Sequence, residues 1–159
     1  MTTLRIGQGF DVHRFSDEPT RQLVLGGVVV AGAPGLAGHS DADVLAHALC
    51  DALLGAAGLG DIGQHFPDTD PRYAGADSML LLAEVVARVA EAGCRAVNAD
   101  CTVIAERPKL SPFVPAIVES LSAALGVPVS VKATRAEGLG AIGRSEGIAC
   151  LAVVLVDRE

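Results

Sequence analysis

Asp11, His13 and His47 are the residues whose types and spacing point most directly to chemistry. Asp11 and His13 are two residues apart in a strand-like segment, and side chains at positions i and i+2 of a strand share a face. His47, on a predicted helix, is a candidate third ligand, because three protein ligands with an open fourth position are typical of catalytic zinc. Spacing alone leaves another interpretation open, in which Asp11 and His13 form a structural hydrogen bond at a solvated strand end.

A dense polar segment, residues 39–43, immediately precedes the predicted helix. Ser40 and Asp41 are either binding groups or helix caps, since such side chains accept hydrogen bonds from the first amides of a helix. Asp43, four residues before His47, lies on the same helical stripe. A carboxylate beside a metal-bound histidine commonly orients its ring. Asp43 is therefore predicted either to orient His47 or to be a surface acid.

Two loops also carry candidate binding groups. Residues 60–70 are polar and contain proline, and they either bind a ligand or form a simple Pro/Asp turn. Residues 138–143 match GxGxxG, but a dinucleotide site requires that motif to open the helix of a βαβ unit. Only four residues separate Gly143 from the next predicted strand, so we exclude a dinucleotide site. Walker A and HExxH motifs are absent from the sequence.

Hydrophobic periodicity predicts the elements that must position these residues. Strands are expected over residues 4–13, 96–105, 129–133 and 148–156, a hairpin over 22–30 interrupted at Gly26 and Gly27, and helices over about 43–58, 77–92 and 111–126. Loops are expected over residues 31–38, 60–72 and 137–147. This order predicts an α+β fold with helices on one face of the sheet and a partner subunit on the other. The last strand is expected to be buried on both faces.

Composition limits the remaining possibilities. The 159 residues fit one domain, residues 1–159, and 50% of them are hydrophobic but only 3% aromatic, so small aliphatic side chains must form the core. The mean hydropathy of +0.43 indicates that apolar surface is buried between subunits. A net charge of −7 with scattered basic residues argues against a nucleic-acid partner.

Membrane insertion and secretion are not expected. The longest strictly apolar run, residues 148–156, is nine residues long, whereas a membrane-spanning helix needs about 20. The first residues are strand-like and lack the apolar region of a signal peptide. The four cysteines form no CxxC pair and are predicted to be small buried hydrophobes in a reducing cytoplasm.

Eight motifs taken together resemble one enzyme family over nearly the whole chain. They are GxGFDVH (7–13), HSDADVxxH (39–47), DALLGA (51–56), GDIGxxFPDTD (60–70), GADS (75–78), RPK (107–109), VKAT (131–134) and GRxEGIA (143–149). This set resembles the 2-C-methyl-D-erythritol 2,4-cyclodiphosphate synthases of the non-mevalonate isoprenoid pathway. The resemblance implies a phosphorus–oxygen lyase that converts 4-diphosphocytidyl-2-C-methyl-D-erythritol 2-phosphate to the cyclic diphosphate and CMP. It also implies homotrimers packed through their sheets, with active sites between subunits.

The resemblance assigns roles by position. Asp11, His13 and His47 would hold Zn²⁺, and Glu137 would hold Mg²⁺ or Mn²⁺ together with the substrate phosphates. His39 would act at the reacting phosphates. Arg135, which is not the residue the family commonly has at its position, is expected either to face the substrate phosphates or to turn outward, so that only the backbone of the pocket is kept. The substrate would be bound by Ser40, Asp61, Gly63, Phe66, Pro67, Asp68, Thr69, Asp70, Ala105, Glu106, Arg107, Pro108, Lys109, Leu110, Ser111, Ala133, Thr134 and Arg144. Among these, residues 105–111 and 133–134 would form the cytidine pocket, contributed by the neighbouring subunit.

Two positions depart from the family pattern. Arg135 follows VKAT where the family commonly has threonine, and Ala141 stands where the family often has an aromatic residue. In the family, that aromatic residue and the arginine matching Arg144 face a central cavity of the trimer that can hold an isoprenoid diphosphate. Two other functions compete with the cyclase: a metal-dependent phosphodiesterase that would release an opened pair of monophosphates, and a trimer that only binds prenyl diphosphates.

Overall fold

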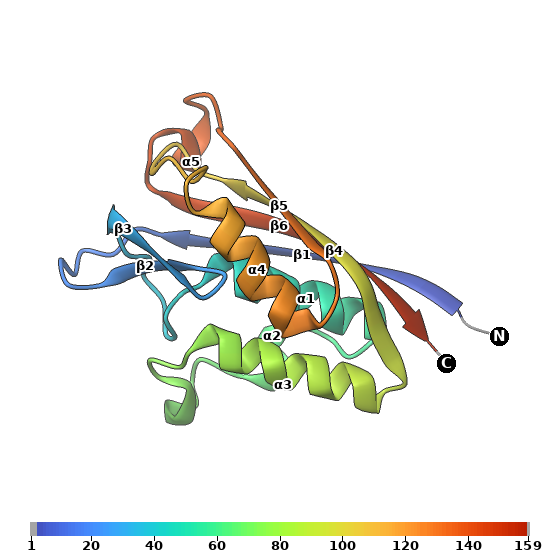
Figure 1. Cartoon of the computed structure of the whole chain (residues 1–159). Helices are drawn as coiled ribbons and strands as arrows, with labels where there is room; N and C mark the ends of the chain where they lie inside the picture. The colour runs from blue at the N-terminus through green and yellow to red at the C-terminus, as the bar shows by residue number, and fades with distance from the viewer. Residues whose placement is uncertain (1–2, 159) are drawn as a thin grey trace.

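The sheet begins with β1 (Thr3–Arg14), whose side chains alternate between two environments. In the computed structural model, which describes residues 3–158, β1 pairs antiparallel with β6 (Gly147–Arg158). Strand β6 pairs antiparallel with β4 (Cys94–Ile104), and β4 pairs parallel with β5 (Val129–Thr134). The result is a mixed sheet of four strands in the order β1-β6-β4-β5. Strands β2 (Gln22–Leu25) and β3 (Val28–Pro34) form a separate hairpin beside it (Figure 1).

Three longer helices, α1 (Val44–Ala57), α3 (Ser78–Glu91) and α4 (Val114–Leu125), lie on one side of this sheet (Figure 1). Local sequence sets their limits. The side chains of Asp43 and Asp77 accept hydrogen bonds from the first amides of α1 and α3. Helices α1 and α4 end where Gly58 and Gly126 adopt left-handed backbone conformations. These features confirm the predicted α+β architecture with helices on one face.

Two glycines of β1 let α1 approach the strand closely. Gly7 and Gly9 share the inward face of β1 with Asp11 and His13. A Cβ atom at Gly9 would lie 1.8 Å from the carbonyl oxygen of Ala48, and one at Gly7 equally close to that of Ala52. No other residue type fits at either position without moving the backbone. The contact brings the strand and the helix that carry the candidate ligands together.

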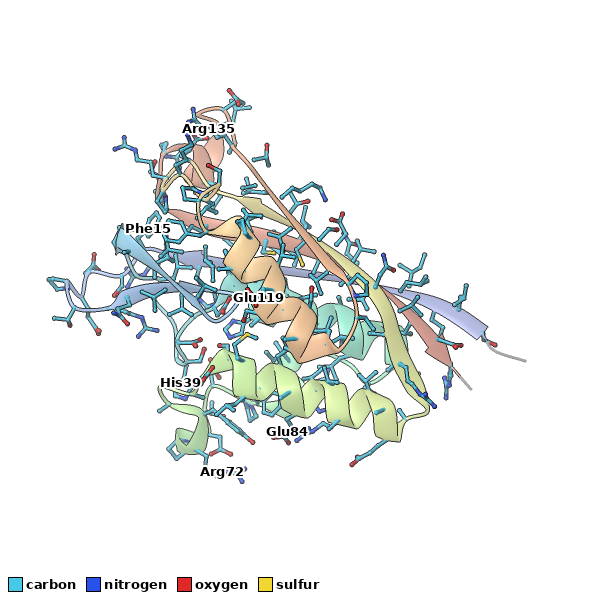
Figure 2. All side chains as sticks on the ribbon, in the orientation of Figure 1. Phe15, His39, Arg72, Glu84, Glu119 and Arg135 are labelled. Atoms are coloured by element: carbon cyan, nitrogen blue, oxygen red, sulfur yellow. The ribbon has the colours of Figure 1, made fainter. Side chains whose placement is uncertain are left out.

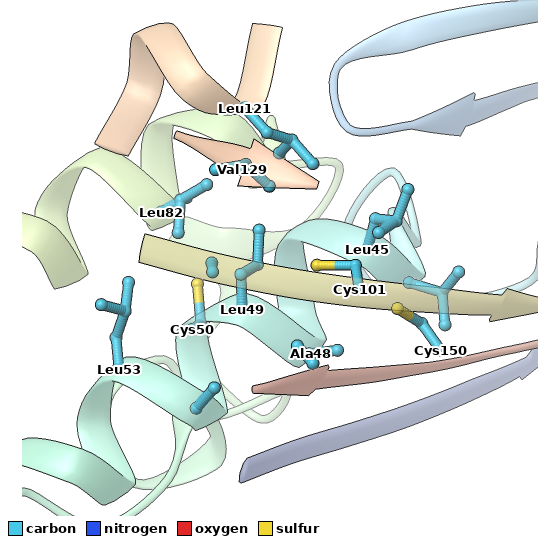
Figure 3. Close-up of a cluster of buried hydrophobic side chains, with 14 of the residues drawn as sticks. Leu45, Ala48, Leu49, Cys50, Leu53, Leu82, Cys101, Leu121, Val129 and Cys150 are labelled. Carbon is cyan, nitrogen blue, oxygen red and sulfur yellow. The ribbon is translucent and has the colours of Figure 1, made fainter. Parts of the chain in front are cut away.

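The core between helices and sheet is aliphatic, as the composition predicts. Leu45, Leu49 and Leu53 of α1 pack toward Leu82 of α3 and Leu121 of α4 (Figure 3). The four cysteines are free and buried, which confirms that part of the prediction. Burial raises the pKa of the Cys50 thiol well above its usual range, so this thiol is unreactive. Within residues 3–158, no helix has the length and apolar content needed to cross a bilayer.

The opposite sheet face carries exposed apolar side chains. They are Leu4, Ile6, Phe10 and Val12 on β1, Val97 on β4 and Val153 on β6. The expectation that the last strand is buried on both faces is therefore wrong for the single chain, because Val153 is 44% exposed. Within residues 3–158, these side chains are left uncovered on this side of the sheet.

Three predicted loops contain short regular elements. Strand β3 continues to Pro34, so the first residues of the predicted loop 31–38 belong to that strand. The segment 60–72 contains α2 (Ile62–His65) and the start of the 3-10 helix η1 (Pro71–Tyr73), and the segment 137–147 contains α5 (Gly140–Gly143). These elements are single turns, too short to leave a hydrophobic period in the sequence.

Candidate active site

The side chains of Asp11, His13 and His47 converge where β1 meets α1. The Asp11 Oδ2 atom lies 3.0 Å from His13 Nε2 and 3.1 Å from His47 Nδ1. The two ring nitrogens are 3.3 Å apart. One carboxylate oxygen and two imidazole nitrogens form a donor set that suits zinc, with room left for a further ligand. The predicted cluster is thus assembled. Of the alternative interpretation, the hydrogen bond between Asp11 and His13 is present, but the solvated strand end is wrong, because the side chain of Asp11 is only 23% exposed.

Backbone contacts set the tautomer of His13. Its Nδ1 atom lies 2.7 Å from the carbonyl oxygen of Ala37. Because a carbonyl can only accept, Nδ1 carries the proton and Nε2 faces Asp11 with its lone pair when the ring is neutral. A histidine fixed in this way by a backbone carbonyl is prepared to bind a metal through Nε2.

The charges of the cluster shift its acid–base behaviour. Burial disfavours the ionised form of Asp11, but hydrogen bonds from His13 and His47 outweigh it and hold the pKa of the carboxyl well below its usual range. Burial likewise disfavours the charged ring of His13, but its hydrogen bond to Asp11 outweighs that effect and raises the pKa of His13 above 6.5. Without a metal, the ion pair between Asp11 and His13 therefore persists to a higher pH than a free histidine would keep its charge.

A network of side chains, Ser40, Ser78 and Asp41, lies at the other ring nitrogen of His47, Nε2, and is called the relay below. The Nε2 atom lies 2.8 Å from Ser78 Oγ and 3.2 Å from Ser40 Oγ. The Ser78 hydroxyl donates to Asp41 Oδ1, and the Ser78 amide donates to Asp41 Oδ2 at 3.1 Å. Ser78 is fully buried at the first turn of α3, and 31 residues separate it from His47. The sequence analysis assigned no role to Ser78, although the GADS motif contains it.

Asp43 does not orient His47, so that prediction is wrong. Its carboxylate is fully buried and accepts hydrogen bonds from the amides of Gly26 and Gly27, at 2.9 and 2.8 Å, and from those of Leu45 and Ala46. It caps α1 and ties the turn between β2 and β3 to that helix. Ser40 and Asp41, by contrast, do not cap α1; both contact the relay at Ser78.

A cavity of about 500 Å³ opens beside the cluster. Its lining includes the ligand candidates His13 and His47 and the predicted substrate residues His39, Ser40, Gly63, Phe66, Pro67 and Asp68. Gly38, Ile62, Tyr73 and Leu81 complete the wall and were not predicted. Asp61, Thr69 and Asp70 belong to the same loop but lie outside the lining. This size and mixed lining are typical of a small-molecule site.

Contacts with α1 and α3 fix the loop that forms one wall of this cavity. Asp51 on α1 accepts a hydrogen bond from the Ile62 amide at 2.7 Å. The Arg88 guanidinium of α3 lies 5.0 Å from the ring centroid of Phe66, and Tyr73 packs edge-on against the same ring at 5.3 Å. The loop is therefore a positioned structure and not a simple turn.

Arg21 holds the segment that leads to His39 and Ser40. Its guanidinium donates to the carbonyl oxygens of Leu36, Gly38 and Ser40. Sequence reasoning missed Arg21, because nothing in its surroundings marks an arginine that binds only backbone. His39 itself is exposed, and its Nε2 atom lies 3.3 Å from the carbonyl oxygen of Asp70.

The predicted cytidine-pocket residues line a second cavity, of about 390 Å³. Its walls are Ala105, Glu106, Arg107, Pro108, Lys109, Leu110, Ser111, Ala133, Thr134 and Arg135. This cavity and the first share no residue. In Figure 2, Arg135 lies at the top of the molecule and His39 lies far below it, near the start of α3. Within one chain, the two residues predicted to act on the phosphates are therefore not brought together.

Glu137 and Arg144 flank α5 at the same end of the molecule as Arg135 (Figure 1). Both are exposed. Glu137 has a left-handed backbone, with φ 53°, and Arg144 pairs with Glu146 at 2.7 Å. Neither residue lies near the Asp11 cluster in the single chain.

Known proteins identify the family. Residues 4–157 match the YgbB family. The 2-C-methyl-D-erythritol 2,4-cyclodiphosphate synthase of Moorella thermoacetica is 60% identical over 160 residues, covering 98% of this chain and 97% of that protein. The bifunctional IspDF of Campylobacter jejuni aligns with a TM-score of 0.94 and 44% identity over 100% of this chain, which spans 43% of that longer one. The IspF of Plasmodium falciparum in its CDP complex aligns with a TM-score of 0.84 and 32% identity, covering 98% of this chain and 97% of that one. The chain therefore belongs to the YgbB family, as its motifs predict.

Proposed function

We propose that the protein is a 2-C-methyl-D-erythritol 2,4-cyclodiphosphate synthase. One observation carries the proposal: the Asp11, His13 and His47 cluster opens into a cavity lined by residues of the family motifs, in a chain 60% identical to a protein of that name. The substrate is 4-diphosphocytidyl-2-C-methyl-D-erythritol 2-phosphate.

The reaction is an intramolecular phosphoryl transfer. An oxygen of the 2-phosphate attacks the β-phosphorus and forms the new P–O bond. The bond between the β-phosphorus and the oxygen leading to the α-phosphate breaks, and CMP leaves with that oxygen. No water is consumed. The main obstacle is repulsion between two phosphates that must approach each other, so positioning and charge neutralisation are the contributions needed from the site.

We assign Zn²⁺ to Asp11, His13 and His47, and Mg²⁺ or Mn²⁺ to Glu137 together with substrate phosphates. When bound, such ions neutralise phosphate charge and act as Lewis acids. The donor set at Asp11 supports zinc, as described above. For Glu137 the support is its exposed carboxylate, a suitable ligand for a hard cation that keeps several waters.

The chain's own groups bind and orient the substrate. His39 and Ser40 face the diphosphate and the erythritol portion, and residues 61–70 bind the erythritol phosphate region. The fixing of this loop by Asp51 and Arg88 supports that role, because a rigid wall holds reacting atoms near attack geometry.

We further propose a homotrimer in which each active site combines the first cavity of one subunit with the second cavity of its neighbour. Two features support this arrangement: the two cavities are separate within one chain, and the uncovered sheet face is apolar. An isoprenoid diphosphate would enter the central cavity near Ala141 and Arg144, with less contact than an aromatic residue at position 141 would give. We place the enzyme in the cytoplasm.

Arg135 is assigned to the substrate phosphates. It lines the second cavity beside Thr134, and an arginine offers five donors and a permanent charge where threonine would offer one neutral donor. Arg135→Ala should lower kcat/KM by at least about tenfold, and Arg135→Thr should restore much of the loss.

Phosphorus NMR of the purified protein with substrate, Zn²⁺ and Mg²⁺ tests the proposed reaction. The expected result is a cyclic diphosphate together with CMP, and a His47→Ala variant should form neither. An opened pair of monophosphates would instead support the phosphodiesterase. Binding of prenyl diphosphate without turnover would support the binding trimer.

A further inference from the structure

His47 is the one member of the cluster whose second ring nitrogen contacts only side chains in the described part of the chain. His13 is oriented by the backbone carbonyl of Ala37, which no substitution removes. The orientation of His47 depends on the hydroxyls near its Nε2 atom, those of Ser78 at 2.8 Å and Ser40 at 3.2 Å. Its role as a ligand therefore depends on residues that can be changed.

The direction of these hydrogen bonds follows from the chemistry of Asp41. A carboxylate oxygen only accepts, so the Ser78 hydroxyl donates its proton to Asp41 Oδ1. The Ser78 oxygen is then left as an acceptor toward His47 Nε2, while the carboxylate of Asp11 is an acceptor toward Nδ1 at 3.1 Å. The two acceptors compete for the ring proton, and the proton must lie on Nε2, toward Ser78, for Nδ1 to offer its lone pair to an ion at the cluster.

The placement of Ser78 is not explained by helix capping. Asp77 already caps α3, by accepting from the Met79 amide at 2.8 Å. Ser78 is 0% exposed, and its hydroxyl contacts only Ser40, Asp41 and His47 among the described residues. A buried hydroxyl needs partners, and this one finds them all at the site.

We propose that Ser78, held by Asp41, is a positioning residue that selects the metal-binding tautomer of His47. The inference rests on the proposed metal centre and adds a relay that joins α3 and the 39–43 segment to a ligand on α1. Outer contacts of this kind typically change metal affinity by about 10–100-fold.

The test measures zinc affinity and the tautomer of His47 separately. Zinc dissociation constants are obtained by competition with a chromophoric chelator, and the tautomer from long-range ¹H–¹⁵N NMR spectra of the metal-free protein with the ring neutral. The variants are Ser78→Ala, Ser78→Thr, which keeps the hydroxyl, and Asp77→Ala, which weakens the cap of α3 without removing the relay. Asp41→Asn serves as a second probe if Ser78→Ala does not fold.

The expected result is that the Nε2–H form of neutral His47 is more populated in the unmodified protein than in Ser78→Ala, where the Asp11 carboxylate draws the ring proton to Nδ1. Zinc affinity should fall about 10–100-fold in that variant and recover in Ser78→Thr, while Asp77→Ala keeps both properties. Unchanged affinity and tautomer in Ser78→Ala would overturn the positioning role, as would an equal loss in Asp77→Ala. Failure of the unmodified protein to bind zinc would instead overturn the proposed metal centre, while the tautomer measurement would still report on the relay.

Discussion

The carboxylate of Asp43 accepts a hydrogen bond from the backbone amide of Gly26 at 2.9 Å, across 17 residues of sequence. The same carboxylate caps α1, so a single side chain joins the first turn of the helix that carries His47 to the turn between β2 and β3. The contact is fully buried. The Asp43 carboxylate thus stabilises the frame around the cluster, while Asp43 meets His47 through the backbone, by accepting from the His47 amide at 3.0 Å.

Replacing Asp43 with alanine should lower the free energy of unfolding by roughly 2–4 kcal/mol, because four amide donors lose their acceptor inside the protein. Asp77→Ala removes an exposed cap of similar chemistry and should cost only about 1 kcal/mol. Urea denaturation of both variants checks the difference, and equal losses would contradict the role given to the buried contact.

Gly9→Ala should separate β1 from α1, since its Cβ would lie 1.8 Å from the Ala48 carbonyl oxygen. We expect a loss of at least about 3 kcal/mol in stability, together with weaker zinc binding. Gly55→Ala provides the control, because a Cβ there meets nothing within 4 Å, and it should gain about 0.5–1 kcal/mol from helix propensity. Thermal melts and zinc titrations of both variants test this prediction. A Gly9→Ala protein with unchanged melting temperature and zinc affinity would contradict the close approach of β1 to α1.

The metal-free protein should have a defined dependence on pH. The pKa of His13 is raised, so the stability contributed by its charged form is complete below about pH 6.5 and is lost as the pH rises through the folded-state pKa. The pKa of Asp11 is lowered, so its contribution is present above pH 3.8 and is lost at lower pH. Chelator-treated protein should therefore lose stability as the pH rises above about 6.5. Asp11→Asn should flatten this profile, and an equally steep profile in that variant would exclude the pair as its source.

Asp51 is expected to affect substrate binding although it lies outside the cavity lining. Asp51→Ala should free the Ile62 amide and raise KM by about tenfold with a smaller change in kcat, because the loop over residues 61–70 loses one of its attachments. Asp51→Asn keeps an acceptor oxygen and should behave like the unmodified enzyme. Steady-state kinetics separate the two constants; a change confined to kcat would place Asp51 elsewhere in the mechanism.

Mixed oligomers test whether active sites are shared between subunits. His47→Ala and Lys109→Ala each inactivate one of the two cavities in our proposal, and these cavities share no residue. Subunits exchanged between the two inactive variants should regain part of the activity, because some interfaces then combine two intact cavities. Activity is measured after exchange, which is verified by native mass spectrometry. Mixed trimers without activity would show that each chain acts alone.

Short-range pattern predicted the long helices, the strands and the shared face of Asp11 and His13. The addition of His47, 34 residues beyond His13, to the cluster was predicted from the resemblance of the motifs to a known family. Alternation along β1 places Asp11 and His13 on one face, and a cap before a periodic segment marks α1. The short elements α2, η1 and α5 lacked such a pattern.

Residues that act through distant contacts were not predictable in this way. Asp43 follows the spacing expected of a group that orients His47, yet its partners include two amides of a distant hairpin. Ser78 reaches His47 only because α3 starts beside α1, and Arg21 acts through three carbonyl groups that every residue type possesses. In each case the deciding contact depends on tertiary packing.

The close approach of β1 to α1 at Gly7 and Gly9 also predicts which positions of this sequence can change during evolution. Where side chains set the distance between two elements, each change of volume in a close-packed core shifts that distance. Here backbone atoms of Ala48 and Ala52 set it, and backbone is common to every residue type. We expect the core positions to exchange aliphatic residues of similar size during evolution, while the position of His47 relative to Asp11 stays the same. Positions 7 and 9 should admit no residue but glycine.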